Sequence, residues 1–264
     1  MTFYTTIEFD VSRDGLAVIT LNRPDKHNAF NATLINELSD AFDDIRRESN
    51  IRLVILRGAG KSFSAGADLD WMKAAASYTQ QENEADAFRL AQMLRKLHDL
   101  PQPTLALVQG AAIGGGAGLV AACDIVIAMS KTTFKFSEVR LGLTPATISP
   151  FVINAIGRRW AKALFMTAES FDAAYAEKMA LVHYIAQDEK EMRELEEYIT
   201  SLVFAAAPGA VTDAKRLVDD VAGQEITDAL GHETSKRIAA RRASEEGREG
   251  VSAFLEKRKP DWTK

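Results

Sequence analysis

The stretch LALVQGAAIGGGAGLVAAC (residues 105–123) joins a strand-like apolar run, a turn of small residues and a second apolar run. Small residues let a backbone approach a ligand closely and leave its N–H groups free. Because a helical run follows from Leu119, these N–H groups should lie at a helix N-terminus, where an anion is favoured. The turn lacks a Gly-Lys-Ser/Thr ending, and Leu119 replaces the last glycine of a dinucleotide fingerprint. The stretch therefore predicts an anion-stabilising turn that is neither of these phosphate sites.

A second turn of this kind occurs in VILRGAGKSFSAGADL (residues 54–69), again after a strand-like run. Each turn by itself is typical of structural packing. Two such turns on neighbouring strands offer what an oxyanion hole needs, namely two backbone donors that converge on one oxygen. Each donor of this kind contributes about 3 kcal/mol of transition-state stabilisation.

The surrounding pattern predicts an α/β fold, because strand-like and helical runs alternate through about the first 190 residues. The clearest helix follows Asn31, a good N-cap, with apolar residues at helical spacing. The expected strands are Leu16–Leu21, Leu53–Leu56, Thr104–Val108, Asp124–Ala128 and Thr133–Phe136.

The last part of the chain changes to helices alone. We expect one over Glu189–Phe204, others from Pro208 and from about Thr227, and a short one that ends in EKRKP (256–260). The pattern thus divides the chain into an α/β core (1–190) and a helical region (191–264). Residues 236–264 hold nine Lys or Arg against five Asp or Glu, which indicates either a solvated face or a phosphate contact. Residues 74–86 are polar and weakly patterned, and we expect a mobile loop there.

Composition narrows the function. The net charge is −5, so no overall basic field draws the chain to nucleic acid, and a small-molecule substrate is the better default. Cys123 is the only cysteine and is expected to be a small buried hydrophobe rather than a nucleophile. The four histidines form no metal-ligand cluster, so we expect no metal. The N-terminus shows no targeting pattern and no run is long enough to span a membrane, so a cytoplasmic protein is expected.

Five motifs in order give the chain a resemblance to the crotonase family, the enoyl-CoA hydratases and isomerases. They are LNRPDKHNA (21–29), FSAGADL (63–69), GAAIGGG (110–116), FSEVRLGLTP (136–145) and EGREGVSAFLEKRKP (246–260). The resemblance implies a spiral of ββα repeats, a C-terminal helical region that trimerises, and a homotrimer or a hexamer of two trimers. It implies an acyl-CoA thioester as substrate, with no separate cofactor because coenzyme A is part of that substrate.

The resemblance also assigns residues. The oxyanion donors fall on the backbone N–H groups of Ala67 and Gly115, and the acid/base glutamate on Glu138. The coenzyme A contacts fall on Lys26, Ala29, Ala65, Ala67, Asp68, Leu69 and Gly115, with Phe254 and Lys257 reaching a neighbouring subunit's coenzyme A. The acyl pocket is expected from Trp71, Met72, the loop at 74–86 and residues after Pro145.

One family residue is missing. Hydratases of this family use two glutamates, and the first, which activates water, falls on Gly118. A lone Glu138 fits a Δ3-Δ2-enoyl-CoA isomerase, or a hydratase whose water is held by another side chain or by the substrate. The segment ATISP (146–150) in place of a glycine-rich stretch resembles bacterial methylglutaconyl-CoA hydratases. Their substrates carry a distal carboxylate that a second acid would repel. A non-catalytic CoA-binding homologue is the alternative from another class.

Overall fold

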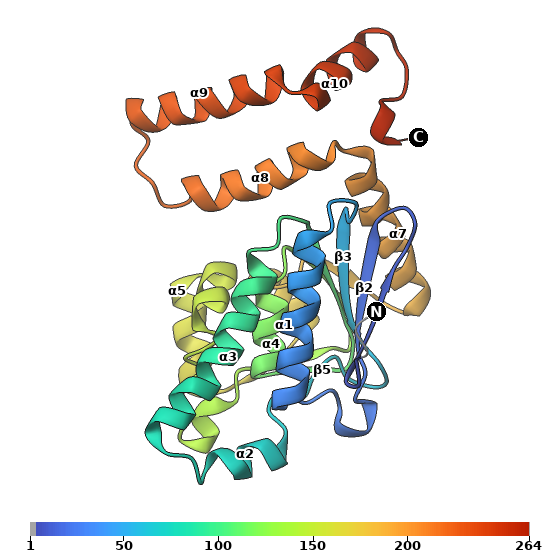
Figure 1. The fold of residues 1–264 in the computed structure, drawn as a ribbon. Coiled ribbons are helices and arrows are strands. Elements are labelled where there is room, and N and C mark those ends of the chain that lie inside the picture. Colours follow the sequence, from blue (N-terminus) through green and yellow to red (C-terminus); the bar gives the residue numbers. More distant parts are fainter. Residues whose placement is uncertain (1–3, 264) are drawn as a thin grey trace.

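The computed structural model describes residues 4–263 and contains two sheets with helices packed around them (Figure 1). The larger sheet has the order β1-β2-β3-β4-β6-β9. The pair β1–β2 is antiparallel and the other neighbours are parallel. Its strands are Ile7–Val11, Leu16–Leu21, Leu53–Gly58, Thr104–Val108, Ile125–Met129 and Tyr184–Ala186.

The smaller sheet contains β5 (Ala111–Ile113), β7 (Thr133–Lys135) and β8 (Ser170–Asp172). The chain passes from β4 to β5 and then into helix α4 (Gly115–Ala121), and from β6 to β7 before helix α5 (Ser149–Thr167). Each unit thus gives one strand to each sheet and then a helix. This arrangement is the ββα repeat that the sequence predicts, and it sets the turn after β5 beside the turn after β3.

The central strands of the large sheet are buried on both faces because they are apolar at nearly every position. In β3, Val54 and Leu56 belong to the main core with helix α1 (Ala32–Arg47), whereas Leu53 and Ile55 face helix α7 (Glu189–Ala205). Residues that are apolar on both faces are typical of parallel strands covered on each side. The predicted strands at 16–21 and 104–108 are confirmed, and the one at 53–56 continues for two more residues to Gly58. The strand predicted at 124–128 is shifted by one residue to Ile125–Met129, and the one predicted at 133–136 ends one residue earlier.

Helix α1 (Ala32–Arg47) begins as the sequence predicts. The Asn31 side chain accepts a hydrogen bond from the Leu34 N–H at 2.9 Å, and this caps the first turn. The six apolar residues at helical spacing are all buried against the main core: Leu34, Ile35, Leu38, Ala41, Phe42 and Ile45.

The expected loop at 74–86 is wrong for most of its length. Helix α2 (Leu69–Ala75) ends within it, and helix α3 (Gln80–His98) starts at residue 80. The physical reason is a capping box, in which Thr79 and Glu82 each satisfy the other's backbone N–H. A polar helix start therefore resembles a loop when only hydrophobic pattern is considered.

The remaining helices are α6 (Ala173–Lys178), α8 (Pro208–Val221), α9 (Asp228–Ala243) and α10 (Glu245–Leu255). Helices α7, α8 and α9 begin within one residue of their predicted starts, and α10 ends at Leu255, just before the EKRKP segment in which its end is predicted. In Figure 1, α8, α9 and α10 lie at one end of the molecule, and α2 lies at the other. Short 3₁₀ helices cover Pro24–Lys26, Glu138–Leu141 and Asp261–Thr263, and no helix in the described residues has the length and apolar character of a membrane span.

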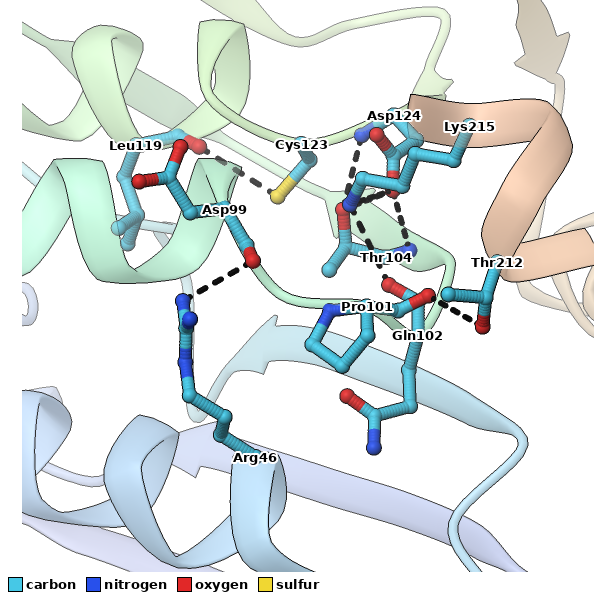
Figure 2. A network of polar contacts seen from close by, with 10 residues as sticks. All are labelled: Arg46, Asp99, Pro101, Gln102, Thr104, Leu119, Cys123, Asp124, Thr212 and Lys215. Carbon is cyan, nitrogen blue, oxygen red and sulfur yellow. Dashed lines mark hydrogen bonds and ion pairs between the residues drawn. The ribbon is translucent and has the colours of Figure 1, made fainter. Parts of the chain in front are cut away.

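A polar network joins helix α8 to the core (Figure 2). The Lys215 ammonium lies 2.6 Å from the Asp124 carboxylate, which also accepts hydrogen bonds from the Thr104 N–H and hydroxyl at 2.8 Å. The Thr212 hydroxyl donates to the Pro101 carbonyl at 3.0 Å. Because the Lys215 side chain is only 14% exposed, this pair is better shielded from water than the chain's surface ion pairs.

Replacing Lys215 by Met is expected to lower the free energy of unfolding by about 1 to 3 kcal/mol, because Asp124 loses a charged donor. Urea unfolding measures this loss. The matched control is Lys190→Met, which removes an exposed pair with Glu194 and should cost about 0.5 kcal/mol or less. Equal losses in the two variants would show that the network does not hold α8.

Candidate active site

The two small-residue turns lie directly side by side. Ser64 pairs with Ala112: the Ser64 N–H donates to the Ala111 carbonyl and the Ile113 N–H donates to the Ser64 carbonyl, both at 3.0 Å. Gly66 has a φ of +88°, and a Cβ there would stand 2.8 Å from the Ile113 carbonyl oxygen. Only glycine permits both this conformation and this approach. The turns therefore pack backbone against backbone.

This packing leaves the two predicted donors without acceptors. Phe30 pairs beside Ala67: its N–H donates to the Gly66 carbonyl at 2.6 Å, and its carbonyl accepts from the Asp68 N–H at 2.9 Å. The Ala67 N–H takes no part in this pairing and has no partner among residues 4–263. The Gly115 N–H opens α4 and is likewise unpaired within the described chain.

Phe30 also brings the two donors into one neighbourhood. Its backbone pairs with Ala67, and its ring lies 2.8 Å from where a Cβ on Gly115 would stand. Any side chain at position 115 would displace this ring. Two unpaired N–H groups around one buried phenylalanine are available to bind an oxygen that gains negative charge.

Glu138 lies beside the same turn. One carboxylate oxygen, Oε1, is 3.3 Å from the position of a Cβ on Gly114, and the other, Oε2, is buried without a hydrogen-bond partner among the described residues. Burial raises the pKa of Glu138, and a hydrogen bond from its own backbone N–H offsets only part of this effect. A carboxyl group in this environment holds a proton to higher pH than an ordinary glutamate and is suited to general acid/base catalysis.

The space beside Gly118 is filled by another side chain. A Cβ on Gly118 would stand 2.3 Å from Cγ2 and 2.7 Å from Cβ of Ile148, which is 1% exposed. Ile148 belongs to the ATISP segment and immediately precedes α5. The position that the resemblance assigns to a water-activating glutamate therefore faces a buried apolar group.

Trp71, on helix α2, contributes a second buried polar group that has no hydrogen-bond partner among the described residues. Its indole is packed against the main core, and its Nε1–H is buried without a partner among the described residues. Native structures leave few buried polar atoms unpaired. Two of the four such side-chain atoms here, Trp71 Nε1 and Glu138 Oε2, belong to residues that the sequence assigns to the acyl site or the chemistry.

The expected coenzyme A walls also adjoin each other. The Ala65 N–H donates to the His27 carbonyl at 2.9 Å, which joins the segment at 26–29 to the turn at 65–69. Lys26 and Leu69 are exposed, and the Leu69 side chain is 72% exposed. Ala29 is buried at 7% exposure.

Asp68 differs from its neighbours because its carboxylate makes an ion pair and a hydrogen bond with other residues of the chain. It pairs with Arg23 at 2.8 Å and accepts the Asp70 N–H at 2.8 Å, which caps α2. Burial raises the pKa of Asp68, but the Arg23 and Asp70 hydrogen bonds outweigh it and hold that pKa below its ordinary value. Sequence reasoning missed Arg23, whose side chain fixes the turn to the segment at 21–29.

Phe254 and Lys257 are not brought to this site within the chain. Phe254 is 82% exposed on α10, at the opposite end of the molecule from α2 (Figure 1). Cys123 is half-buried and its thiol donates to the Leu119 carbonyl. Burial, followed by the Asp124 carboxylate, raises the pKa of Cys123 to about 12, so the thiol is a poor nucleophile.

The repeated ββα units and the paired glycine turns define an α/β protein of the crotonase type. The chain belongs to the enoyl-CoA hydratase/isomerase family, whose model matches residues 12–264. A Legionella pneumophila structure that carries the name crotonase is 44% identical, with 97% of this chain and 98% of that one covered and a TM-score of 0.92.

Curated relatives carry both activities in their names. The short-chain-enoyl-CoA hydratase of Clostridium acetobutylicum is 33% identical and covers 92% of both proteins. The trans-2-decenoyl-[acyl-carrier-protein] isomerase of Streptococcus mutans is 31% identical and covers 95% of both. Enoyl-CoA hydratase/isomerase activity is therefore the coarse function of this chain.

Proposed function

We propose that this protein is an enoyl-CoA hydratase whose preferred substrate is 3-methylglutaconyl-CoA or a similar branched enoyl-CoA with a distal carboxylate. The observation that carries the proposal is the contrast around helix α4. Glu138 lies against Gly114 with one buried carboxyl oxygen that has no partner among the described residues, while Gly118 faces Ile148 where a second acid is expected. Such a site has one acid/base group of its own, Glu138. It suits a substrate whose distal carboxylate can act as the second acid/base group.

The oxyanion hole carries the first part of the reaction. In the proposed complex, the Ala67 and Gly115 N–H groups donate to the thioester carbonyl oxygen. Attack of water at C3 moves the double-bond electrons onto that oxygen and forms an enolate. Donors already in place stabilise this charge without reorganisation, which is the main advantage of a preorganised site.

Proton transfers complete the addition. The water oxygen forms a bond to C3, and its released proton passes to the substrate's distal carboxylate and then to solvent. The enolate collapses and C2 takes the proton of Glu138, which is later restored from solvent. The raised pKa of Glu138 supports this direction because the side chain holds its proton more strongly than an ordinary glutamate does.

The distal carboxylate also needs a place in the site. The Trp71 Nε1–H is a buried donor with no partner among the described residues, and it carries no charge that would compete with Glu138. A neutral donor satisfies a carboxylate at the cost of one desolvated N–H. We assign Trp71 and the adjoining Met72 to the acyl pocket on this basis.

The apolar side chain of Ile148 also favours a second candidate function, that of a Δ3-Δ2-enoyl-CoA isomerase. Ile148 places no base where water must be activated, and an isomerase needs only Glu138 to take a proton from C2 and return it to C4. The similarity to the isomerase of Streptococcus mutans agrees with this candidate. A non-catalytic CoA-binding role would give no function to the unpaired Oε2 of Glu138 or to the two unpaired N–H groups.

Assays of purified protein distinguish the candidates. We expect hydration of 3-methylglutaconyl-CoA with a kcat/KM at least tenfold above that for isomerisation of 3-hexenoyl-CoA. Glu138→Gln is the control for background turnover. Isomerisation of 3-hexenoyl-CoA without hydration of 3-methylglutaconyl-CoA would exclude the hydratase and leave the isomerase.

We further propose that the C-terminal helices join copies of this chain in a trimer or a dimer of trimers, with Phe254 and Lys257 of one copy at the coenzyme A of the next. Support comes from the exposed apolar side chains of α10, including Phe254 at 82%, Leu255 at 72% and Val251 at 59%. Exposed apolar groups gathered on one helix are typical of an interaction face.

A further inference from the structure

We propose that Gly118 and Ile148 act as a coupled pair and that the Ile148 side chain determines substrate specificity by occupying the place of a second acid/base group. The preferred substrate in this statement rests on the proposed function. The coupling itself rests on the packing of α4 against the segment before α5.

The geometry places this pair next to Glu138. The Gly118 N–H donates at 3.0 Å to the carbonyl of Gly114, the N-cap residue of α4, so the two residues are one helical turn apart. Glu138 lies against Gly114 and Ile148 lies against Gly118, so the carboxyl group and the apolar side chain contact successive turns at the start of α4.

The contact is too close for position 118 to change alone. Real Cβ atoms do not approach other atoms to 2.3 Å, and both Gly118 and Ile148 are buried. The interior is densely packed, so Ile148 cannot move away without disturbing α5. Ile148→Ala does not remove the conflict because the Cβ at 2.7 Å remains, whereas Ile148→Gly leaves only the Cα at 3.8 Å.

This arrangement determines which substrates react. A second carboxylate in this space would stand near a substrate's distal carboxylate and repel it. Ile148 carries no charge and so avoids this repulsion. It also leaves the water beside Gly118 without a protein group that could act as its base. Substrates that lack a carboxylate, such as crotonyl-CoA, therefore meet a site with no group that activates water.

The test introduces a glutamate at position 118, once with Ile148 present and once with Ile148 replaced by glycine. We expect Gly118→Glu alone to lower the melting temperature and to gain no hydration of crotonyl-CoA. The double variant Gly118→Glu/Ile148→Gly should recover stability relative to Gly118→Glu and raise kcat/KM for crotonyl-CoA at least tenfold above Gly118→Gln/Ile148→Gly, which has the same shape without the charge. A general base contributes about 10²- to 10⁴-fold, so tenfold is a cautious threshold.

Two results would overturn the proposal. One is a Gly118→Glu variant that is as stable as the wild type and as active on crotonyl-CoA as the double variant. The other is a folded double variant that shows no gain over its glutamine control. If the double variant does not fold, Ile148→Glu replaces it, because it places a carboxylate in the same space without a side chain at position 118. The ratio of kcat/KM for crotonyl-CoA to that for 3-methylglutaconyl-CoA should then be at least threefold above that of Ile148→Gln, and an equal ratio contradicts the role of Ile148.

Failure of the proposed function gives a different result. A wild type that hydrates neither substrate excludes the proposed function, while a gain on crotonyl-CoA in the double variant still supports the coupled pair.

Discussion

Replacing Glu138 by Gln is expected to lower kcat/KM for 3-methylglutaconyl-CoA by about 10²- to 10⁴-fold, the usual contribution of a general acid. Gln has nearly the same shape but cannot give a proton to C2. Steady-state kinetics measure the loss, and it should be in kcat, because the oxyanion donors and the coenzyme A walls are unchanged. A loss below tenfold would show that another group serves C2.

The stability of the same variant provides its control. Because burial raises the pKa of Glu138, the folded state favours the protonated form, and this contribution to stability is lost as pH rises through the raised pKa. Gln carries no such cost, so Glu138→Gln should unfold at a urea concentration no lower than the wild type at neutral pH. A clear fall in the midpoint would mean that the kinetic loss reflects misfolding.

Replacing Ala67 by Pro is expected to lower kcat by about 10²- to 10³-fold, the typical effect of removing one oxyanion-hole donor. Proline has no backbone N–H, and the Ala67 N–H has no partner among residues 4–263, so no hydrogen bond described within the chain is lost. Kinetics with 3-methylglutaconyl-CoA should show a larger change in kcat than in KM. A folded variant with wild-type kcat would remove Ala67 from the oxyanion hole.

The sequence predicts those helices and strands that depend on residues close together in the chain, such as an N-cap or a regular apolar spacing. Asn31 caps α1, and the apolar spacing after it matches the buried face. Strands β2, β3, β4 and β6 follow from apolar runs, whereas β1 alternates apolar and acidic residues and is not among the predicted strands. The short strands β5, β8 and β9 are not among the predicted strands, whereas the equally short β7 is, because it lies in a run of Thr and Phe (TTFKF, 132–136). The start of α3 was missed because the Thr79–Glu82 capping box lies in a polar segment.

The candidate site depends more on long-range packing. The sequence shows that the first glutamate is absent at position 118, but it does not show that Ile148 fills the space. Ile148 lies 30 residues further along the chain (148 − 118), and only the packing of α5 on α4 brings it to Gly118. Asp68 was expected to contact coenzyme A, whereas Arg23, on another segment, takes its carboxylate. In both cases a partner distant in the chain fixes the role.

In the proposed reaction, Glu138 alone transfers the proton at C2 while water adds at C3. Proton NMR of the product formed from 3-methylglutaconyl-CoA in D₂O tests it most directly. We predict a 3-hydroxyacyl-CoA that carries one deuterium at C2, with no such product from Glu138→Gln. Deuterated hydroxy product formed at the wild-type rate by Glu138→Gln, or a shifted double bond without hydroxy product from the wild type, would contradict the claim.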